Sequence, residues 1–431
     1  MKGSKVLKNA SWIIVCRVAQ SVLSMVVTIL TARFLGPSNY GIINYAASIV
    51  AFFVPFMQVG LNFILVQAVI QNDDREGEVM GTALAMSLAS GVLSVIGVFA
   101  FVMVANYNDP TTIIVCVLYS LLLIFQALEH FQYWFQAKLL SKYTSITMLV
   151  AYFVVSAYKI YLLLTGKSVY WFAVSQALDY AIIAFALFAI FNKVSGVKLS
   201  FSKEMAKKMF DKGKHYIFPT LMVTLYANIG KVMLTLMTDE AICGFYSAAV
   251  MCVGMATFVY NAIIESVRPV ILEAKKKGDE SYKKMLTALY SFIIYLALLE
   301  SIFLTIFSKL IVNILYGADY AATIPLLRVL AWYLIFSYIG LVRNVWILAE
   351  EKEKHLWKIN LGGAIVNLVL NFILIPILGA MGSAITALIT QIFTNVIMGY
   401  LIKPIRENNT LMIKSLNPKC LLDMVNIMKQ R

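Results

Sequence analysis

Charged residues are scarce in this sequence of 431 residues and make up only 13% of the chain. Soluble domains carry about 25% charged and about 45–50% apolar residues, whereas 61% of the residues here are hydrophobic. A soluble fold must cover its outer faces with polar side chains, and this chain has too few of them. The composition therefore excludes a soluble globular protein and predicts a chain whose outer faces meet lipid.

Residues that bind metals, form disulfides or hold nucleotides are also few. The five cysteines form no C-x-x-C pair, and there are only three histidines. These counts argue against a metal site or a disulfide framework. The sequence lacks the phosphate-binding pattern G-x-x-x-x-G-K-[ST], so ATP is not expected to drive the protein directly. We therefore expect no metal and no organic cofactor.

The sequence contains instead a succession of apolar runs, each close to the roughly 20 residues that a helix needs to cross a bilayer. We predict an all-α polytopic membrane protein with about twelve transmembrane helices. The predicted spans are residues 10–34, 41–65, 79–105, 111–135, 143–165, 168–192, 214–237, 241–265, 284–312, 321–348, 356–377 and 379–403.

Basic residues give the chain a formal net charge of +14 and fall mainly in alternate loops. Because cytoplasmic loops hold an excess of Lys and Arg, we place both termini in the cytoplasm. The longest basic connection divides the spans six and six. We predict an N-terminal six-helix lobe over residues 1–192, a cytoplasmic basic linker over 193–213, a C-terminal six-helix lobe over 214–403 and a cytoplasmic basic tail over 404–431.

Two further points follow from the charge pattern. The basic residues are scattered over several loops, so nucleic-acid binding is not expected. The loop over residues 71–78 fits the cytoplasmic side less well, because it holds four acidic residues and one arginine. Acidic residues count little in the orientation rule, so the predicted orientation stands.

Four segments carry a resemblance to a known family by their order and spacing. They read TARFLGPSNYGIINY (Thr31–Tyr45), GFYSAA (Gly244–Ala249), LYGADYAATIPLLRVL (Leu315–Leu330) and NLGGAIVNLVLNFILIPILGAMGSAITA (Asn360–Ala387). Together they resemble the polysaccharide-transporter family, of the O-antigen flippase type, within the multidrug/oligosaccharidyl-lipid/polysaccharide exporter superfamily. Within the last segment, Asn367 and Asn371 lie one helical turn apart, where they can hydrogen-bond a neighbouring helix.

The resemblance implies a MATE-like fold of two six-helix lobes around a central cavity that opens alternately to each side. It implies a flippase that moves a polyprenyl-diphosphate-linked oligosaccharide, an O-antigen, capsule or exopolysaccharide repeat unit, from the cytoplasmic to the outer leaflet. The membrane would be the bacterial plasma membrane. The implied partners are this lipid-linked substrate, membrane lipids and other glycan-assembly proteins.

Charged side chains inside the predicted spans are the candidate functional residues, because a charge in the bilayer core is costly. We assign five basic residues to a cationic cavity that binds the substrate: Arg17, Arg343, Arg328, Lys231 and Lys159. Arg17 and Arg343 form an inner tier and the other three an outer tier. Arg offers phosphate a planar fork and Lys a point charge. As alternatives, Lys159 and Lys231 extend to the membrane interface, and Arg328 pairs with an acid.

Three acidic residues are candidates for coupling transport to H⁺ or Na⁺: Asp179, Glu300 and Glu129. An ionised carboxylate at membrane depth needs a partner, water or a proton. The alternative is a structural ion pair with one of the basic residues. His130 follows Glu129, and we expect this lone histidine to be structural.

Other functions on the same fold stay open as alternatives. They are export of a drug and flipping of a lipid-linked peptidoglycan precursor. The excess of intramembrane basic residues argues against cationic drugs, whereas the precursor shares the diphosphate. A membrane-embedded glycosyltransferase or polymerase would need paired acidic or metal-binding residues on substantial outer loops, and the predicted outer loops are short. We therefore expect a transporter and not an enzyme.

Overall fold

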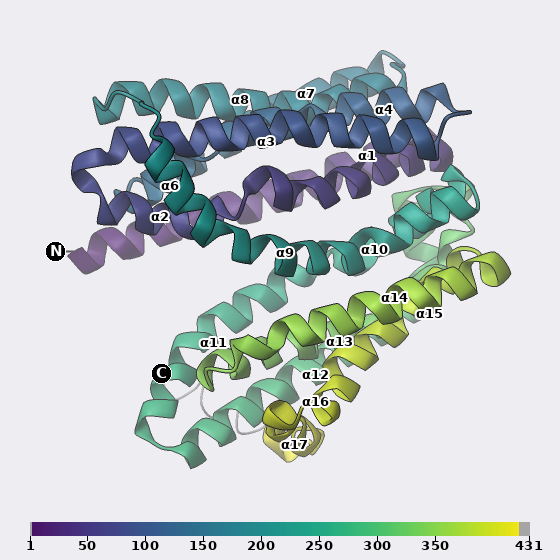
Figure 1. The fold of residues 1–431 in the computed structure, drawn as a ribbon. Helices are drawn as coiled ribbons and strands as arrows, with labels where there is room; N and C mark the ends of the chain where they lie inside the picture. Colours follow the sequence, from purple (N-terminus) through teal and green to yellow (C-terminus); the bar gives the residue numbers. More distant parts are fainter. Residues whose placement is uncertain (1, 422–431) are drawn as a thin grey trace. The chain divides into compact units, whose positions relative to one another are not determined.

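The structure is a computed structural model that describes the backbone of residues 2–421 and the side chains of residues 20–421, apart from residue 277. Every regular element in this part of the chain is a helix, which confirms the all-α class (Figure 1). The chain forms two compact units, Met1–Gly244 and Phe245–Arg431. The boundary between them falls inside one helix.

The first unit holds nine complete helices and the start of a tenth. These are α1 (Lys2–Gln58), α2 (Leu61–Gln71), α3 (Glu76–Ala105), α4 (Pro110–Ser120), α5 (Leu122–Leu128), α6 (Phe131–Ala137), α7 (Ser141–Leu164), α8 (Val169–Ser195), α9 (Lys203–Met237) and α10 (Glu240–Gly254), with the short η1 (Asp73–Arg75) before α3.

A break inside α1 separates two membrane crossings. Gly36 has φ 71° and ψ 173°, which no helix contains, and Pro37 follows it. Phe34 contacts Phe172 at the start of α8, and the Tyr45 hydroxyl donates a hydrogen bond of 2.7 Å to Asn106 at the end of α3. The chain therefore turns back at Gly36, a position where only glycine adopts such a backbone without strain.

The predicted number of crossings is confirmed. Eleven segments of the described chain are long and apolar enough to cross a membrane, and the first, Gln20–Gln71, has 52 residues. At 1.5 Å per residue it would span about 78 Å, more than twice the roughly 30 Å of a bilayer core. Because Gly36 divides it, the crossings number about twelve. The predicted span 111–135 is divided among α4, α5 and α6.

The predicted linker over residues 193–213 is only partly irregular. Helix α8 extends to Ser195, residues 196–202 are non-helical, and α9 begins at Lys203. Ser202 caps α9, since its hydroxyl accepts a hydrogen bond from the Met205 amide at 3.3 Å. The division of the protein into two lobes at this linker stays a prediction.

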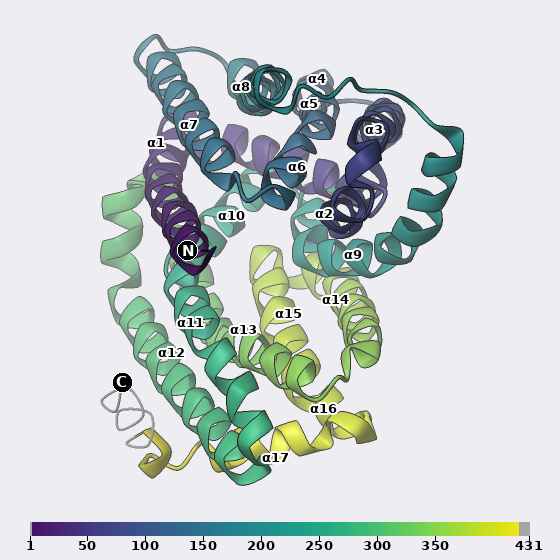
Figure 2. The same cartoon turned by 90° about the vertical axis from the view of Figure 1, so that its left-hand side faces the viewer.

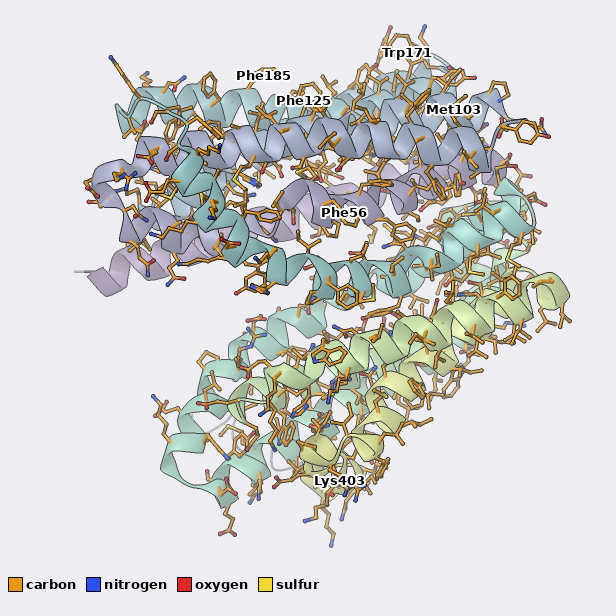
Figure 3. The ribbon with its side chains drawn as sticks, viewed as in Figure 1. Phe56, Met103, Phe125, Trp171, Phe185 and Lys403 are labelled. Carbon is orange, nitrogen blue, oxygen red and sulfur yellow. The ribbon has the colours of Figure 1, made fainter. Side chains whose placement is uncertain are left out.

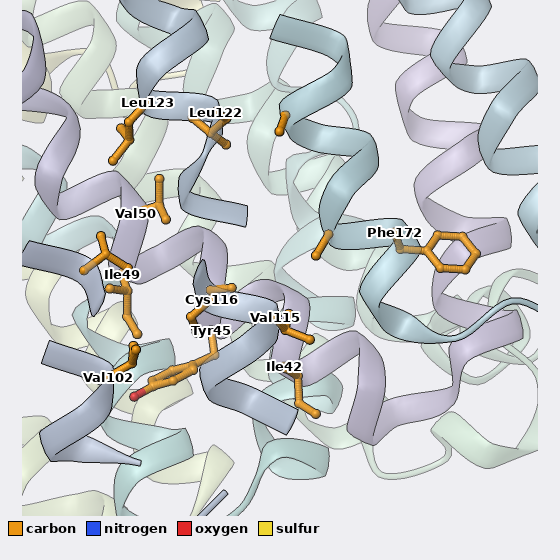
Figure 4. Packing of buried hydrophobic residues seen from close by; sticks show 14 of the residues in the cluster. Ile42, Tyr45, Ile49, Val50, Val102, Val115, Cys116, Leu122, Leu123 and Phe172 are labelled. Atoms are coloured by element: carbon orange, nitrogen blue, oxygen red, sulfur yellow. The ribbon is translucent and has the colours of Figure 1, made fainter. Parts of the chain in front are cut away.

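Apolar side chains fill the interior of the first unit and also cover its outside. One core cluster includes Ile42, Tyr45 and Val115, all buried (Figure 4). Yet Phe185 is 59% exposed, and Met103 and Trp171 are also exposed (Figure 3). A soluble protein seldom exposes so much apolar surface, whereas a chain solvated by lipid must do so. The protein is thus a multi-pass membrane protein.

The segments around Gly41 and Gly244 meet where α1 and α10 pack. A Cβ atom added to Gly41 would overlap the carbonyl oxygen of Glu240, and one added to Gly244 would overlap that of Pro37. Small residues allow this close approach of backbones, which is how membrane helices gain packing contacts. A second approach of this kind joins Gly60 to Gly213 on α9.

The second unit continues α10 and adds α11 (Thr257–Lys277), α12 (Asp279–Leu315), α13 (Thr323–Ala349), α14 (Leu356–Leu378), α15 (Ala380–Ile392), α16 (Met398–Leu401) and α17 (Arg406–Lys414). Its short elements are η2 (Ala318–Tyr320), η3 (Glu353–His355), the π-helix η4 (Phe393–Ile397) and η5 (Lys403–Ile405).

Helix α17, in the predicted basic tail, is fixed to the rest of the second unit. The Tyr290 hydroxyl of α12 donates a hydrogen bond to Asn408 at 2.7 Å, and Lys283 pairs with Glu407 at 2.7 Å. Figure 2 shows α17 lying across the direction of α12. Residues 422–431 of the predicted tail lie outside the described part.

The close contact at Gly41 predicts that two glycine-to-alanine substitutions change the stability in different directions. Gly41→Ala should lower the stability by about 1–3 kcal/mol, because its methyl group overlaps a backbone oxygen that cannot move freely. Gly254→Ala, at a helical glycine with nothing within 4 Å of an added Cβ, should be neutral or stabilising by up to about 1 kcal/mol. Melting temperatures of the purified variants in one detergent would measure this. Equal melting temperatures would refute the contact.

Candidate functional site

Three of the predicted charged residues belong to one neighbourhood of the first unit. Lys159 on α7 is half-buried and interacts electrostatically with Asp179 on α8, and Asp179 interacts in turn with the buried Glu129 between α5 and α6. Helices α7 and α8 pack side by side. The structure thus brings two carboxyl groups and one ammonium group together, in a mixed cluster rather than a purely basic one.

The charges of this cluster are incompletely compensated. No ion pair joins Lys159 to Asp179 among the described side chains, and the Oδ1 atom of Asp179 is buried without a hydrogen-bond partner. A carboxylate oxygen buried in this way costs free energy unless it gains a proton or a cation. Asp179 therefore has, among the described side chains of the first unit, a carboxylate oxygen whose surroundings favour uptake of a positive charge.

His130 has a structural partner next to this cluster. Its Nε2 atom lies 2.8 Å from the Ser87 hydroxyl of α3, and the ring is 2% exposed. The ring also packs edge-on against Tyr133. These contacts are what the expected structural role requires.

Lys231 lies on α9, half-buried and near the buried thiol of Cys243. Its carbonyl accepts a hydrogen bond from Thr235 at 3.2 Å. The described residues give it no carboxylate partner. Its place in a shared cationic cavity with the other basic residues stays a prediction.

Arg343 on α13 is buried, with 7% of its surface exposed. Its Nη1 atom donates to the carbonyl oxygen of Thr394 at 2.8 Å, and Nη2 donates to Asn344 at 3.2 Å. Thr394 belongs to the π-helix η4, whose wide turn frees carbonyl oxygens from regular helix bonding. The Val396 carbonyl of the same turn accepts from Asn409 of α17 at 2.7 Å.

Buried amides surround this π-helix. Asn395 donates to Gln391 at 2.6 Å, and Gln391 donates to the Tyr333 hydroxyl at 3.4 Å. Asn367 of α14 donates to Thr390 at 3.1 Å. Asn371 donates to Asn367 at 2.8 Å, so the asparagine pair bonds to the neighbouring helix as predicted. The Arg343 guanidinium thus stands beside a network of buried amides.

The other two predicted residues of the second unit have separate surroundings. Arg328 on α13 is exposed, and its Nε atom donates to the Ser308 hydroxyl of α12 at 2.9 Å. Glu300 on α12 keeps its Oε2 atom buried without a hydrogen-bond partner. It interacts electrostatically with Tyr260 and Tyr338, whose rings stack with centroids 3.6 Å apart. The structure does not bring Glu300 into ion-pair contact with Arg328.

Two remaining expectations concern Arg17 and bound ions. The side chain of Arg17 lies outside the described residues, so its place in the inner tier stays a prediction. No group of three or more His, Cys, Asp or Glu residues in the described chain could hold a metal ion.

Sequence reasoning missed an ion-pair cluster at the start of α3. The Trp134 indole donates to Glu76 Oε2 at 2.6 Å. The Lys138 ammonium donates to Asp73 at 2.6 Å and also pairs with Glu76. These bonds hold the pKa of Lys138 above its usual value. Arg75 pairs with Glu78 in the same loop at 2.6 Å, so three of the four acids that fitted the orientation rule poorly have a basic partner.

The amide network was also missed, although the sequence carries a signal for it. Gln391 and Asn395 stand four residues apart in an apolar run, the same spacing as Asn367 and Asn371. Polar residues at this spacing share one helix face. The Arg343 bond to Thr394 has no such signal, because it depends on the wide turn of η4.

Comparison with known proteins gives a family. A family model described as "Polysaccharide biosynthesis protein" matches residues 6–275. CapF of Staphylococcus aureus, a "Capsular polysaccharide biosynthesis protein", is 23% identical over 402 residues, which cover 89% of this chain and 96% of the relative. The "Putative O-antigen transporter" of Escherichia coli K12 is 22% identical, and the match covers 94% of this chain and 98% of the relative.

Among solved structures, the chain is similar to a multidrug resistance MATE family transporter of the MOP superfamily in its inward-facing conformation. The TM-score is 0.68 with 14% identity, and the match covers 92% of this chain and 96% of that one. The similarity confirms the predicted MATE-like fold.

The Glu76 cluster predicts that one substitution lowers the stability of the protein and that a second substitution restores most of it. Lys138→Met leaves the Glu76 carboxylate buried with only its Trp134 bond, which should cost roughly 1–3 kcal/mol. Adding Glu76→Gln removes the stranded charge but keeps the oxygen that accepts from Trp134, so the double variant should recover most of this loss.

Melting temperatures of the two variants in detergent would measure this prediction, with exposed Lys193→Met as the matched control. A bond partner that raises a lysine pKa stabilises the protein fully below the unfolded pKa, near 10.5. The effect should therefore be complete at pH 7 and be lost only as the pH rises above that value. A double variant no more stable than Lys138→Met would contradict the ion pair.

Proposed function

Because the chain belongs to the polysaccharide biosynthesis protein family, we propose that it is a flippase for a polyprenyl-diphosphate-linked oligosaccharide. It moves an O-antigen, capsule or exopolysaccharide repeat unit from the cytoplasmic to the outer leaflet by alternating access. The observation that carries the proposal is the match to the Escherichia coli relative over 98% of that protein's length. The protein acts as a transporter and not as an enzyme.

The chemistry of the substrate fits the charged residues described above. A diphosphate carries negative charge into a medium that penalises it, so basic side chains at membrane depth lower the cost of transfer. Arg343 in the second unit has the planar donor group that suits phosphate oxygens. Lys159, Lys231, Arg328 and Arg17 are the further candidates for this role.

We assign energy coupling to the cluster in the first unit. Asp179 has an unpartnered buried oxygen near Lys159 and Glu129. Binding of H⁺ or Na⁺ there would give this oxygen a partner. Phosphate binding near Lys159 would take up the positive charge that otherwise compensates the Asp179 carboxylate. Glu300 is the corresponding candidate in the second unit.

The setting of the protein follows from the same proposal. The multi-pass chain lies in the bacterial plasma membrane with both termini in the cytoplasm, where the basic loops are retained. Its partners are the lipid-linked substrate, membrane lipids and the proteins that assemble the glycan. Flipping of a peptidoglycan precursor or export of a drug would be outcomes of the test below.

Complementation tests the proposal. A bacterium lacking its own O-antigen flippase should regain surface glycan when it makes this protein. Arg17→Ala and Arg343→Lys should lower the restored glycan by about tenfold or more, since each removes charge-assisted hydrogen bonds to phosphate. Lys309→Gln, an exposed basic residue of α12, is the control and should restore glycan fully. Surface glycan is scored at matched expression.

Two negative results of this assay would have different meanings. Wild-type protein that is made but restores no glycan, and instead rescues a strain depleted of its peptidoglycan-precursor flippase, would replace the proposed substrate. Full restoration by both arginine variants would overturn the cationic site while leaving the substrate in place.

The coupling assignment has its own test in proteoliposomes. Asp179→Asn should abolish the response of substrate flipping to an imposed H⁺ or Na⁺ gradient, because the amide binds neither ion as the carboxylate does. Asp319→Asn, in the exposed η2 turn, should leave the response unchanged. A gradient response that survives Asp179→Asn would move the coupling site elsewhere.

A further inference from the structure

An apolar groove of about 440 Å³ lies in the first unit. No charged residue lines it, although two of its lining residues, Leu128 and Phe131, flank Glu129 and His130 in the sequence. This volume is within the roughly 300–1,000 Å³ of known small-molecule sites. Helices α3 and α8 form two of its walls, and residues 199–201 form a third. The residues that line the groove include Gly81, Ala85, Leu88, Phe131, Phe185 and Phe188.

The third wall is fixed in place by two glycines of α3. A Cβ atom on Gly77 would overlap the carbonyl of Lys198, and one on Gly81 would overlap that of Ser200. The Ser200 amide donates to the Gly77 carbonyl at 3.1 Å, and the Ser202 amide donates to the Thr82 hydroxyl at 3.0 Å. The non-helical segment therefore lies against α3 and forms a wall of the groove.

The groove has the depth and chemistry for a hydrocarbon chain. Its α3 residues, Gly81 to Leu88, lie 5–12 residues from the start of the helix at Glu76, or about 8–18 Å along the axis. That range lies mainly in one leaflet of a bilayer core about 30 Å thick and ends just beyond its midplane. Phe185 and Phe201 are 59% and 61% exposed, so the groove presents an aromatic rim and almost no polar group.

Positive charge gathers where the groove wall ends. Lys198 precedes the wall and Lys203 follows it, and both are exposed. The segment 193–214 holds seven lysines against two acids, Glu204 and Asp211, and Asp211 is paired with Lys214 at 2.7 Å. A basic segment at the end of a membrane helix attracts anionic lipid headgroups, with about 1 kcal/mol for each residue near the surface.

We propose that this groove is a binding site for an anionic phospholipid of the leaflet that borders the basic segment. One acyl chain occupies the groove, and Lys198 and Lys203 bind the headgroup phosphate. A bulk phospholipid is favoured over a lipid-linked sugar because mass action fills a site with the more concentrated ligand. The lipid would hold α3, α8 and the 196–202 segment together, and the site is independent of the proposed transport substrate.

The test uses the purified full chain in detergent with phosphatidylglycerol or phosphatidylcholine of identical acyl chains, followed by native mass spectrometry. Wild-type protein should prefer phosphatidylglycerol. Ala85→Trp, which fills the groove, should reduce phosphatidylglycerol binding by about tenfold or more, whereas Leu93→Trp should not. Leu93 is an exposed residue of the same helix outside the groove, and it is therefore the matched control.

A second pair of variants tests the headgroup contact. Lys198→Gln with Lys203→Gln should remove the preference for phosphatidylglycerol, by about 10- to 30-fold for two lysines. Lys167→Gln with Lys309→Gln, two exposed lysines of other segments, should keep it. Should Ala85→Trp fail to fold, Phe185→Trp supplies the measurement. Its fluorescence should be quenched more by brominated phosphatidylglycerol than by brominated phosphatidylcholine, and the two lysine substitutions should remove the difference.

Three results would overturn the proposal. Phosphatidylglycerol binding retained by Ala85→Trp would place the lipid elsewhere, and equal binding of the two phospholipids by wild type would refute the headgroup contact. Displacement of phosphatidylglycerol by undecaprenyl phosphate at equal concentration would assign the groove to the lipid-linked substrate instead. None of these results bears on the complementation assay, so the proposed flippase function stands or falls separately.

Discussion

The fold depends on one constraint, which is that a peptide group in hydrocarbon has no water to bond. Helices satisfy the constraint along their length, and the described chain contains no other regular element. Where helices break, another backbone lies close by. The Gly60 break lies against Gly213, and Pro37, after the Gly36 turn, lies against Gly244. Glycine at Gly60 and Gly213, and at Gly244 opposite Pro37, allows these backbones to approach closely.

The same constraint applies to charged side chains, because a charge or polar atom at membrane depth needs a partner. Glu76 bonds to Trp134 and Lys138, and Arg343 donates to a carbonyl of the wide turn and to Asn344. Asp179 and Glu300 each keep a buried oxygen without a hydrogen bond. A protein gains nothing in stability from such an oxygen. These two carboxylate oxygens are among the buried polar atoms that have no hydrogen-bond partner within the described chain.

Much of the fold could be predicted from the sequence, because the length and polarity of a span are local properties. The number of crossings, the turn after Phe34 and the Asn367–Asn371 pair all followed from short stretches of chain. The partners of the charged residues did not follow. Arg343 bonds to a carbonyl that only a π-helix makes available, and Glu76 bonds to Trp134, 58 residues away. The Lys159 neighbourhood required the packing of α7 on α8, which periodicity alone does not give.

The π-helix η4 also has a consequence for how this helix can move. Its five residues, Phe393–Ile397, hold one residue more per turn than the α-helical segments on either side. If that extra residue moved along the helix, each residue that it passed would rotate by about 100° and advance about 1.5 Å. The guanidinium of Arg343 and the amide of Asn409 donate hydrogen bonds to two carbonyls of this turn, those of Thr394 and Val396. Such a movement of the extra residue would therefore have to break both of these hydrogen bonds.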